Sequence, residues 1–275
     1  MAYIDRDGVR LYYEVHGTGA ALLLTHGYSS STRMWTAQID MLAKDFQLIL
    51  WDMRGHGRSD YPAAPQAYSE EATVADMAAL LDVVGAPSAV IGGLSLGGYM
   101  SLAFHRVHPN RTRALLIIDT GPGYRSADAR AAWNQSAIKT AERFETEGLK
   151  ALTRGGEARS GKARGGETRA GAARAAEPPR AEHRDAYGLA LAARGLLRQR
   201  DAKVIDSLPS IAVPALIVVG ADDQPFLAPA NYMAAKIPGA KLATIPNAGH
   251  VANRDNPAAF NAALSSFLRE AGFAK

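Results

Sequence analysis

The chain has 275 residues, of which 47% are hydrophobic and 21% charged, so it is not a wholly disordered protein and is long enough for one large domain with a buried core. It contains no cysteine, which excludes a disulfide scaffold, a thiolate zinc site and a cysteine nucleophile. The net charge of +4 is compatible with a nucleic-acid partner, but the excess of basic residues is confined to one internal segment.

Strand and helix signals alternate along the first 125 residues. Asp7-Gly8 separates two short alternating runs and is typical of a two-residue hairpin turn. Ser69 followed by two glutamates predicts the start of a helix, because it combines a capping side chain with negative charge in the first turn. The expected elements are strands over residues 2–6, 9–16, 21–25, 46–51, 88–92 and 114–119, and helices over about residues 69–84 and 98–108.

The same alternation resumes at Pro214. It predicts strands over residues 215–220 and 241–245 and helices over residues 229–236 and 257–271. Apolar strands that alternate with helices indicate a mostly parallel sheet covered on both faces. Ligands of such sheets bind outside the carboxyl ends of the strands, so we expect the functional residues directly after strands.

The insertion between these two halves, residues 121–209, has no strand signal. Residues 150–200 carry twelve Lys and Arg against five Asp and Glu, a net +7, whereas the rest of the chain carries −3. Arginine recurs there every five residues, a period of neither helix nor strand, at Arg154, Arg159, Arg164, Arg169 and Arg174. A flexible low-complexity stretch, a basic lid that attracts acidic substrates, and a nucleic-acid tail are the three interpretations, the last without aromatic residues for stacking bases.

The strongest single motif is Gly93-Leu94-Ser95-Leu96-Gly97, which fits Gly-x-Ser-x-Gly. It follows a predicted strand and precedes a predicted helix, which is the context that the motif requires. The small flanking residues allow a sharp turn that exposes the serine hydroxyl. We interpret Ser95 as a nucleophile, and a glycine-rich turn with an incidental serine is the alternative.

A serine nucleophile needs a general base and an acid that orients the base. His250 follows the last predicted strand, at the sheet edge where Ser95 emerges, and this position favours it over the six other histidines. Asp222 and Asp223 both follow the strand over residues 215–220, so either is a candidate acid. Asp119, which ends another predicted strand, is a further candidate.

Two backbone N–H groups are needed to bind the oxyanion that develops during attack. Leu96 follows the nucleophile, and Tyr28 lies in the loop after the strand over residues 21–25. We expect the backbone N–H groups of these two residues to bind the oxyanion. Four large side chains are candidates for an acyl pocket, although each also suits ordinary packing: Met34, Trp35, Tyr99 and Trp133.

These pieces together resemble the α/β-hydrolase superfamily, in the branch of small esterases, lactonases, C–C hydrolases and cofactor-free haloperoxidases. The order serine, acid, histidine is the one expected there. The resemblance implies that the acid lies three residues after the glycine that ends its strand, which selects Asp223, and that residues 121–209 form a cap. The matching motifs are Thr25-His26-Gly27-Tyr28, the loop from Asp52 to Ser59 with a structural Arg54-Gly55-His56-Gly57, the elbow, the loop from Gly220 to Pro225, and Ala248-Gly249-His250.

We therefore expect an α/β-hydrolase fold with a mostly parallel eight-stranded sheet, helices on both faces, a core made of residues 1–120 and 210–275, and an inserted cap. The expected reaction is hydrolysis of a small carboxylic ester through an acyl-enzyme. No cofactor or metal is expected, because the sequence has neither a nucleotide-binding glycine loop nor a histidine–carboxylate cluster with metal-ligand spacing. No apolar run approaches the roughly 18 residues of a membrane span, so we expect a cytoplasmic protein without membrane partners. No nucleic-acid partner is expected either, because the basic segment lacks aromatic residues for stacking bases.

Several alternatives remain open. The same three residues would also serve lactone opening, C–C bond hydrolysis or perhydrolysis, whereas aspartate at the elbow, which haloalkane dehalogenases and epoxide hydrolases of this fold use, is absent. A small-molecule receptor that kept the fold would bind its ligand without turnover. A nucleic-acid binder would depend on the arginine-rich residues 151–180.

Overall fold

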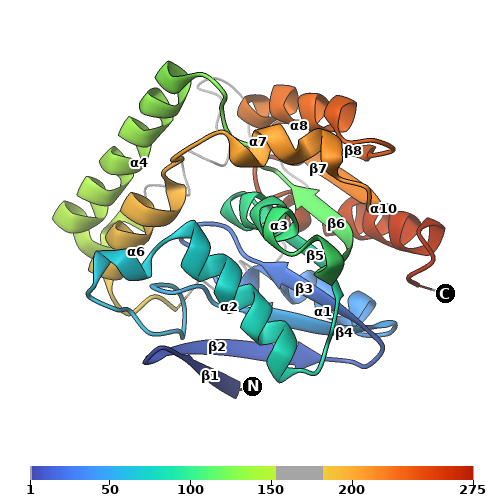
Figure 1. Cartoon of the computed structure of the whole chain (residues 1–275), viewed down its shortest axis with the longest axis horizontal. Coiled ribbons are helices and arrows are strands. Elements are labelled where there is room, and N and C mark those ends of the chain that lie inside the picture. Colours follow the sequence, from blue (N-terminus) through green and yellow to red (C-terminus); the bar gives the residue numbers. More distant parts are fainter. Residues whose placement is uncertain (1, 153–181, 275) are drawn as a thin grey trace, which may run out of the picture.

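A computed structural model describes residues 2–152 and 182–274, and its centre is a single eight-stranded sheet (Figure 1). The strand order is β1-β2-β4-β3-β5-β6-β7-β8, in which β2 pairs antiparallel with β1 and with β4, and all other pairs are parallel. This confirms the expected fold class. The strands are β1 (Ala2–Arg6), β2 (Val9–His16), β3 (Ala20–Thr25), β4 (Phe46–Trp51), β5 (Ala89–Leu94), β6 (Thr112–Ile118), β7 (Ala215–Gly220) and β8 (Lys241–Ile245).

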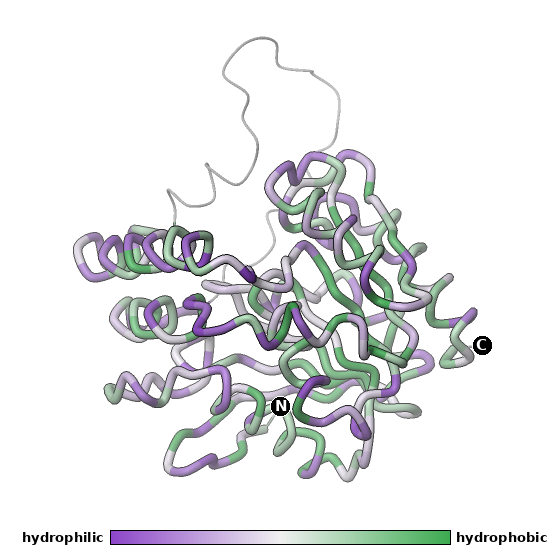
Figure 2. Tube along the Cα trace, turned by 45° about the horizontal axis from the view of Figure 1, so that its top comes forward, coloured by the Kyte–Doolittle hydropathy of each residue, from purple (hydrophilic) through white to green (hydrophobic). Residues whose placement is uncertain are grey.

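The central strands of the sheet are buried on both faces, to which alternate residues of each strand point. On β3, Leu22 and Leu24 belong to one apolar cluster and Leu23 to the other. One cluster is completed by α2 (Glu70–Val83), α3 (Leu96–Val107) and α8 (Gln224–Lys236), and the other by α1 (Thr36–Leu42) and α10 (Pro257–Glu270). Figure 2 shows the hydrophobic residues gathered in the strands between these layers.

In the residues that the structure describes, the segment between β6 and β7 consists of helices joined by loops. It contains α4 (Ala127–Glu147), η4 (Gly148–Lys150), α6 (Ala186–Ala192), the π-helical turn η5 (Ala193–Leu197), α7 (Lys203–Ser207) and η6 (Leu208–Ser210). In Figure 1, α4 and α6 lie side by side at the edge of the molecule. The arginine repeat lies outside the described residues, so its three interpretations stay predictions, as do the cap boundaries.

Two helices begin earlier than the sequence predicts. The first, α3, starts directly after Ser95 instead of at residue 98, because Ser95 itself forms the turn. The second, α8, starts at Gln224 instead of at residue 229, since the Asp223 carbonyl accepts the N–H groups of Phe226 and Leu227, at 2.9 and 3.2 Å.

The remaining short helices are η1 (Thr32–Trp35), η2 (Pro65–Ala67), η3 (Pro109–Arg111) and α9 (Ala252–Asp255). Within the described residues, no helix is long and apolar enough to span a membrane.

Candidate active site

Ser95 occupies the tight turn between β5 and α3. Its φ of 56° lies in the left-handed region, which is strained for a residue with a side chain. The turn depends on its glycines: a Cβ on Gly97 would lie 2.1 Å from the Thr25 carbonyl oxygen, and a Cβ on Gly93 would lie 2.4 Å from the Gly97 carbonyl carbon. The Gly-x-Ser-x-Gly spacing therefore packs the elbow against β3 and fixes the position of the serine.

A chain of two hydrogen bonds joins the predicted nucleophile, base and acid. The distance from Ser95 Oγ to His250 Nε2 is 2.9 Å, and that from His250 Nδ1 to Asp223 Oδ2 is 2.8 Å. An ionised carboxylate only accepts, so Nδ1 carries the imidazole proton and Nε2 can accept the serine hydroxyl. Asp223 is buried, whereas Asp222 is exposed, and it is Asp223 that contacts His250.

Phe226 contacts the imidazole and was not predicted from the sequence. Its ring lies 4.7 Å from that of His250, centroid to centroid, with 31° between the planes. The early start of α8 places Phe226 in the first turn after Asp223, beside the histidine. Recognising in the sequence that the helix starts at Gln224 would have indicated that Phe226 lies close to the acid and the histidine.

The predicted oxyanion loop passes beside the nucleophile. A Cβ on Gly27 would lie 3.6 Å from the Cβ of Ser95, and Tyr28 is the next residue. On the other side, Leu96 is the first residue of α3, so its N–H has no acceptor within the helix. The Gly27 N–H points elsewhere, since it donates to Met34 Sδ at 3.4 Å.

The four candidate pocket residues all have structural contacts. Trp35 is completely buried in the apolar cluster under α1 and α10, and this burial argues against contact with a substrate. Met34 is buried in the same cluster, and the Tyr99 hydroxyl donates to a glutamate of α2 at 3.1 Å. Trp133, on α4, donates its indole N–H to the Leu197 carbonyl at 2.6 Å. The pocket roles of all four residues stay predictions.

The loop that the resemblance marked as structural is buried beside α2. The Arg54 guanidinium forms two hydrogen bonds with the carboxylate of Asp76, at 2.7 and 2.8 Å, and both side chains are buried. His56, two residues later, is completely buried as well. These contacts are those of a packed loop and leave Arg54 without a role at the Ser95 elbow.

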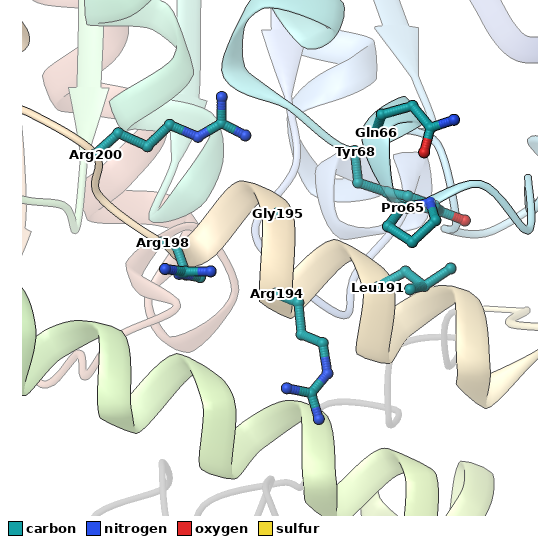
Figure 3. Close-up of a pocket in the computed structure, with 8 residues that line it drawn as sticks. All are labelled: Pro65, Gln66, Tyr68, Leu191, Arg194, Gly195, Arg198 and Arg200. Carbon is teal, nitrogen blue, oxygen red and sulfur yellow. The ribbon is translucent and has the colours of Figure 1, made fainter.

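A cavity of about 310 Å³ lies between η2 and η5 (Figure 3), and its lining includes none of the predicted catalytic residues. Figure 3 shows Arg194 pointing away from Gln66 toward α4, where it pairs with Glu145 at 2.8 Å. The lining residues are Pro65, Gln66, Tyr68, Leu191, Arg194, Gly195, Arg198 and Arg200. In the described part of the chain, no group of three or more histidine or acidic side chains is arranged to hold a metal ion.

Comparison with known proteins identifies the family. The model of the alpha/beta hydrolase fold matches residues 20–257. The chain is 28% identical, over 95% of its length and 96% of the relative, to a Bacillus subtilis protein named putative 2-succinyl-6-hydroxy-2,4-cyclohexadiene-1-carboxylate synthase.

Two solved structures are similar over almost the whole chain. One is a thermophilic esterase from Thermogutta terrifontis, with TM-score 0.82, 27% identity and coverage of 98% of this chain and 99% of that one. The other is Est816, described as an N-acyl homoserine lactone degrading enzyme, with TM-score 0.70, 26% identity and coverage of 97% and 100%. The chain therefore belongs to the α/β-hydrolase family, and hydrolase activity is what the family and these relatives support.

Proposed function

We propose that the protein is a serine hydrolase that cleaves small carboxylic esters through an acyl-enzyme. The observation that carries this proposal is the hydrogen-bonded chain from Ser95 through His250 to Asp223, with distances of 2.9 and 2.8 Å. Similarity to the esterase structure supports the ester as substrate. The cytoplasmic location and the absence of nucleic-acid and membrane partners stay predictions.

In the first half-reaction, Ser95 Oγ attacks the ester carbonyl carbon while its proton passes to His250 Nε2. Asp223 holds the imidazole in the required tautomer and stabilises the imidazolium that forms. The N–H groups of Leu96 and Tyr28 bind the oxyanion. Collapse of the tetrahedral intermediate breaks the bond to the alcohol oxygen, which takes the proton from His250 Nε2.

In the second half-reaction, a water molecule attacks the acyl carbon of the ester formed with Ser95. His250 Nε2 takes a proton from this water and returns it to Ser95 Oγ as the acid leaves. The strained backbone of Ser95 and its place ahead of α3 keep the oxygen accessible for both attacks.

The test is hydrolysis of short- and medium-chain p-nitrophenyl esters by the wild type, Ser95→Ala and a control, Ser266→Ala. Ser266 is an exposed serine of α10 whose hydroxyl donates to Glu270 at 2.8 Å. We expect Ser95→Ala to lose activity on the order of 10⁶-fold and Ser266→Ala to keep it. Activity that survives in Ser95→Ala, or a wild type inactive on every ester, contradicts the proposal.

Lactone opening by the same residues is the second candidate. It is favoured by the similarity to Est816, whose described activity is the degradation of N-acyl homoserine lactones. The chemistry differs only in that the leaving alcohol stays attached to the acyl group. Comparing kcat/KM for homoserine lactones with that for open-chain esters of equal acyl length decides between the two candidates.

A further inference from the structure

Asp119 is a buried carboxyl group that the proposed mechanism does not use. It follows β6 directly and is completely buried. Its φ of 43° is in the left-handed region, which aspartate adopts more readily than most residues with a side chain. Its backbone N–H donates to the Val218 carbonyl at 2.8 Å, which ties the residue to β7.

The two carboxyl oxygens of Asp119 accept N–H groups from two different loops. Oδ1 accepts the N–H of Gly220 at 2.8 Å, and Oδ2 accepts the N–H of Ala252 at 3.2 Å. Gly220 ends β7 three residues before Asp223, and Ala252 begins α9 two residues after His250. One side chain therefore joins the loop of the proposed acid to the loop of the proposed base.

The two carboxyl oxygens of an aspartate match the two donors at this position better than an asparagine would. Two N–H donors need two acceptor oxygens, whereas an asparagine would turn its NH₂ group toward one of them. Burial raises the pKa of Asp119 well above its usual value, although both backbone hydrogen bonds oppose this rise, and the neighbouring Asp223 and Asp255 charges add to it. The surroundings thus disfavour the charged form of this carboxyl, and the N–H groups of Gly220 and Ala252 are the contacts that favour it.

We propose that Asp119 is a positioning residue that holds the Asp223 loop and the His250 loop at the separation required for the hydrogen bonds to His250. Proton transfer from serine depends on this separation, and misplacement by about 1 Å can cost about 10²-fold in rate. The inference rests on the proposed function of Ser95, His250 and Asp223. Asp119 itself touches no reacting atom.

The test uses Asp119→Asn and a matched control, Asp52→Asn. Asp52 is an equally buried carboxyl that also accepts two backbone N–H groups, from Thr32 at 2.7 Å and Arg58 at 2.9 Å, but neither loop carries Asp223 or His250. We expect Asp119→Asn to lower kcat about 10- to 100-fold with KM changed less than about twofold, and Asp52→Asn to change both less than about twofold. An unchanged kcat in Asp119→Asn, or an equal loss in Asp52→Asn, overturns the proposal.

A double-mutant cycle with Asp223→Asn separates positioning from general structural damage. If Asp119 acts through the Asp223–His250 pair, Asp119→Asn should cost less than about twofold once Asp223 is replaced. The same loss in both backgrounds contradicts positioning.

Ala252→Pro provides a second variant if Asp119→Asn does not fold. It removes one of the two N–H donors to Asp119, at the first position of α9, where proline is tolerated. The same loss in kcat is expected.

A fluorophosphonate probe distinguishes failure of this inference from failure of the proposed function. Ser95 Oγ attacks phosphorus, fluoride leaves, and His250 takes the serine proton, so labelling reports the nucleophile without an ester substrate. Slower labelling of Asp119→Asn than of the wild type supports the inference even if no ester is turned over. Equal labelling rates refute it even if esters are hydrolysed.

Discussion

His250 and a cluster of three other histidines lie near the carboxyl ends of the strands, and they differ in exposure and in hydrogen-bond partners. His250 is partly exposed, with 15% of its side chain accessible, and contacts a carboxylate on one side and a serine on the other. The His56 ring contacts those of His26 and His183 at steep angles, with centroids 5.0 and 5.8 Å apart. The first two are completely buried, and burial lowers the pKa of all three.

The partners of the buried rings are backbone groups. His26 Nδ1 donates to the Gly27 carbonyl at 2.7 Å, and its Nε2 accepts the Met53 N–H at 3.0 Å. His56 Nδ1 donates to the Arg54 carbonyl at 3.0 Å. A neutral imidazole satisfies these contacts, whereas a protonated ring in such a site would be costly. A histidine near the sheet edge is therefore suited to proton transfer only where a carboxylate and solvent reach it.

The largest expected effect is that of replacing His250 by asparagine, and the same replacement of the buried His56 is the comparison. We predict that His250→Asn lowers kcat/KM for an active substrate by about 10⁴- to 10⁶-fold, because the serine loses its base. His56→Asn keeps a donor for the Arg54 carbonyl, so its kcat/KM should fall less than about tenfold. Steady-state kinetics on both folded variants checks this, and comparable losses would remove the distinction between the two groups.

Acid should destabilise the protein through the buried histidines. Burial lowers the pKa of His26 to about 3, whereas an unfolded histidine has a pKa of about 6.5. Between these values only the unfolded chain binds the proton, so the stabilising contribution of neutral His26 is present above about pH 6.5 and is lost as pH falls. From pH 7 to pH 5 the free energy of unfolding should fall by about 2 kcal/mol from this group alone.

Urea unfolding of the wild type and His26→Asn at both pH values measures this contribution. The wild type is compared with the variant because burial also raises the pKa of Asp52 to about 6. Protonation of Asp52 stabilises the folded protein as pH falls, which opposes the effect of His26. That contribution is common to both chains and cancels in the difference. A variant with the same pH dependence as the wild type would show that His26 does not titrate as its burial predicts.

Phe226 should have a smaller effect that is specific to His250. Its ring packs on the imidazole at 4.7 Å, and aromatic pairs contribute about 0.5–1.5 kcal/mol beyond area burial. We predict that Phe226→Leu lowers kcat about 2- to 10-fold and that Phe226→Ala lowers it further. The His250→Asn background provides the control, because there the loss on replacing Phe226 should disappear. A loss of equal size in both backgrounds would assign Phe226 to substrate binding or folding.

The smallest expected effect concerns the contact between the oxyanion loop and the helices that follow β6. The Tyr28 hydroxyl donates to the Leu189 carbonyl of α6 at 2.8 Å, and its ring packs against Phe144 of α4, 6.0 Å between centroids. Tyr28→Phe keeps the ring and removes the hydroxyl that donates to Leu189, so we predict a loss of about 1 kcal/mol in the free energy of unfolding. Thermal or urea denaturation checks this value, and an unchanged stability would mean that the contact adds nothing.

Most of the fold could be predicted from local patterns. The runs that became β4, β7 and β8 have the predicted bounds, since a buried parallel strand appears in the sequence as a short apolar run between turns. The helix starts were less accurate at α3 and α8, because a turn that holds Ser95 or Asp223 can begin a helix without a capping signal. The complete burial of Trp35, one of the four candidate pocket residues, is also something that a single sequence does not reveal.

The sequence by itself determined the residue types, their order and their places after strands: Ser95 in its glycine elbow, an acid loop after β7, and His250 after β8. The family resemblance already selected Asp223, and the tertiary structure added the hydrogen bond that joins it to His250. Only the tertiary structure decided that Phe226 packs on the imidazole and that Asp119 joins the His250 loop to the acid loop. The physical reason is the separation along the chain of the residues that interact. Periodicity and turn chemistry act over a few residues, whereas the hydrogen bond from Gly220 to Asp119 joins residues 101 positions apart and exists only once the strands lie side by side.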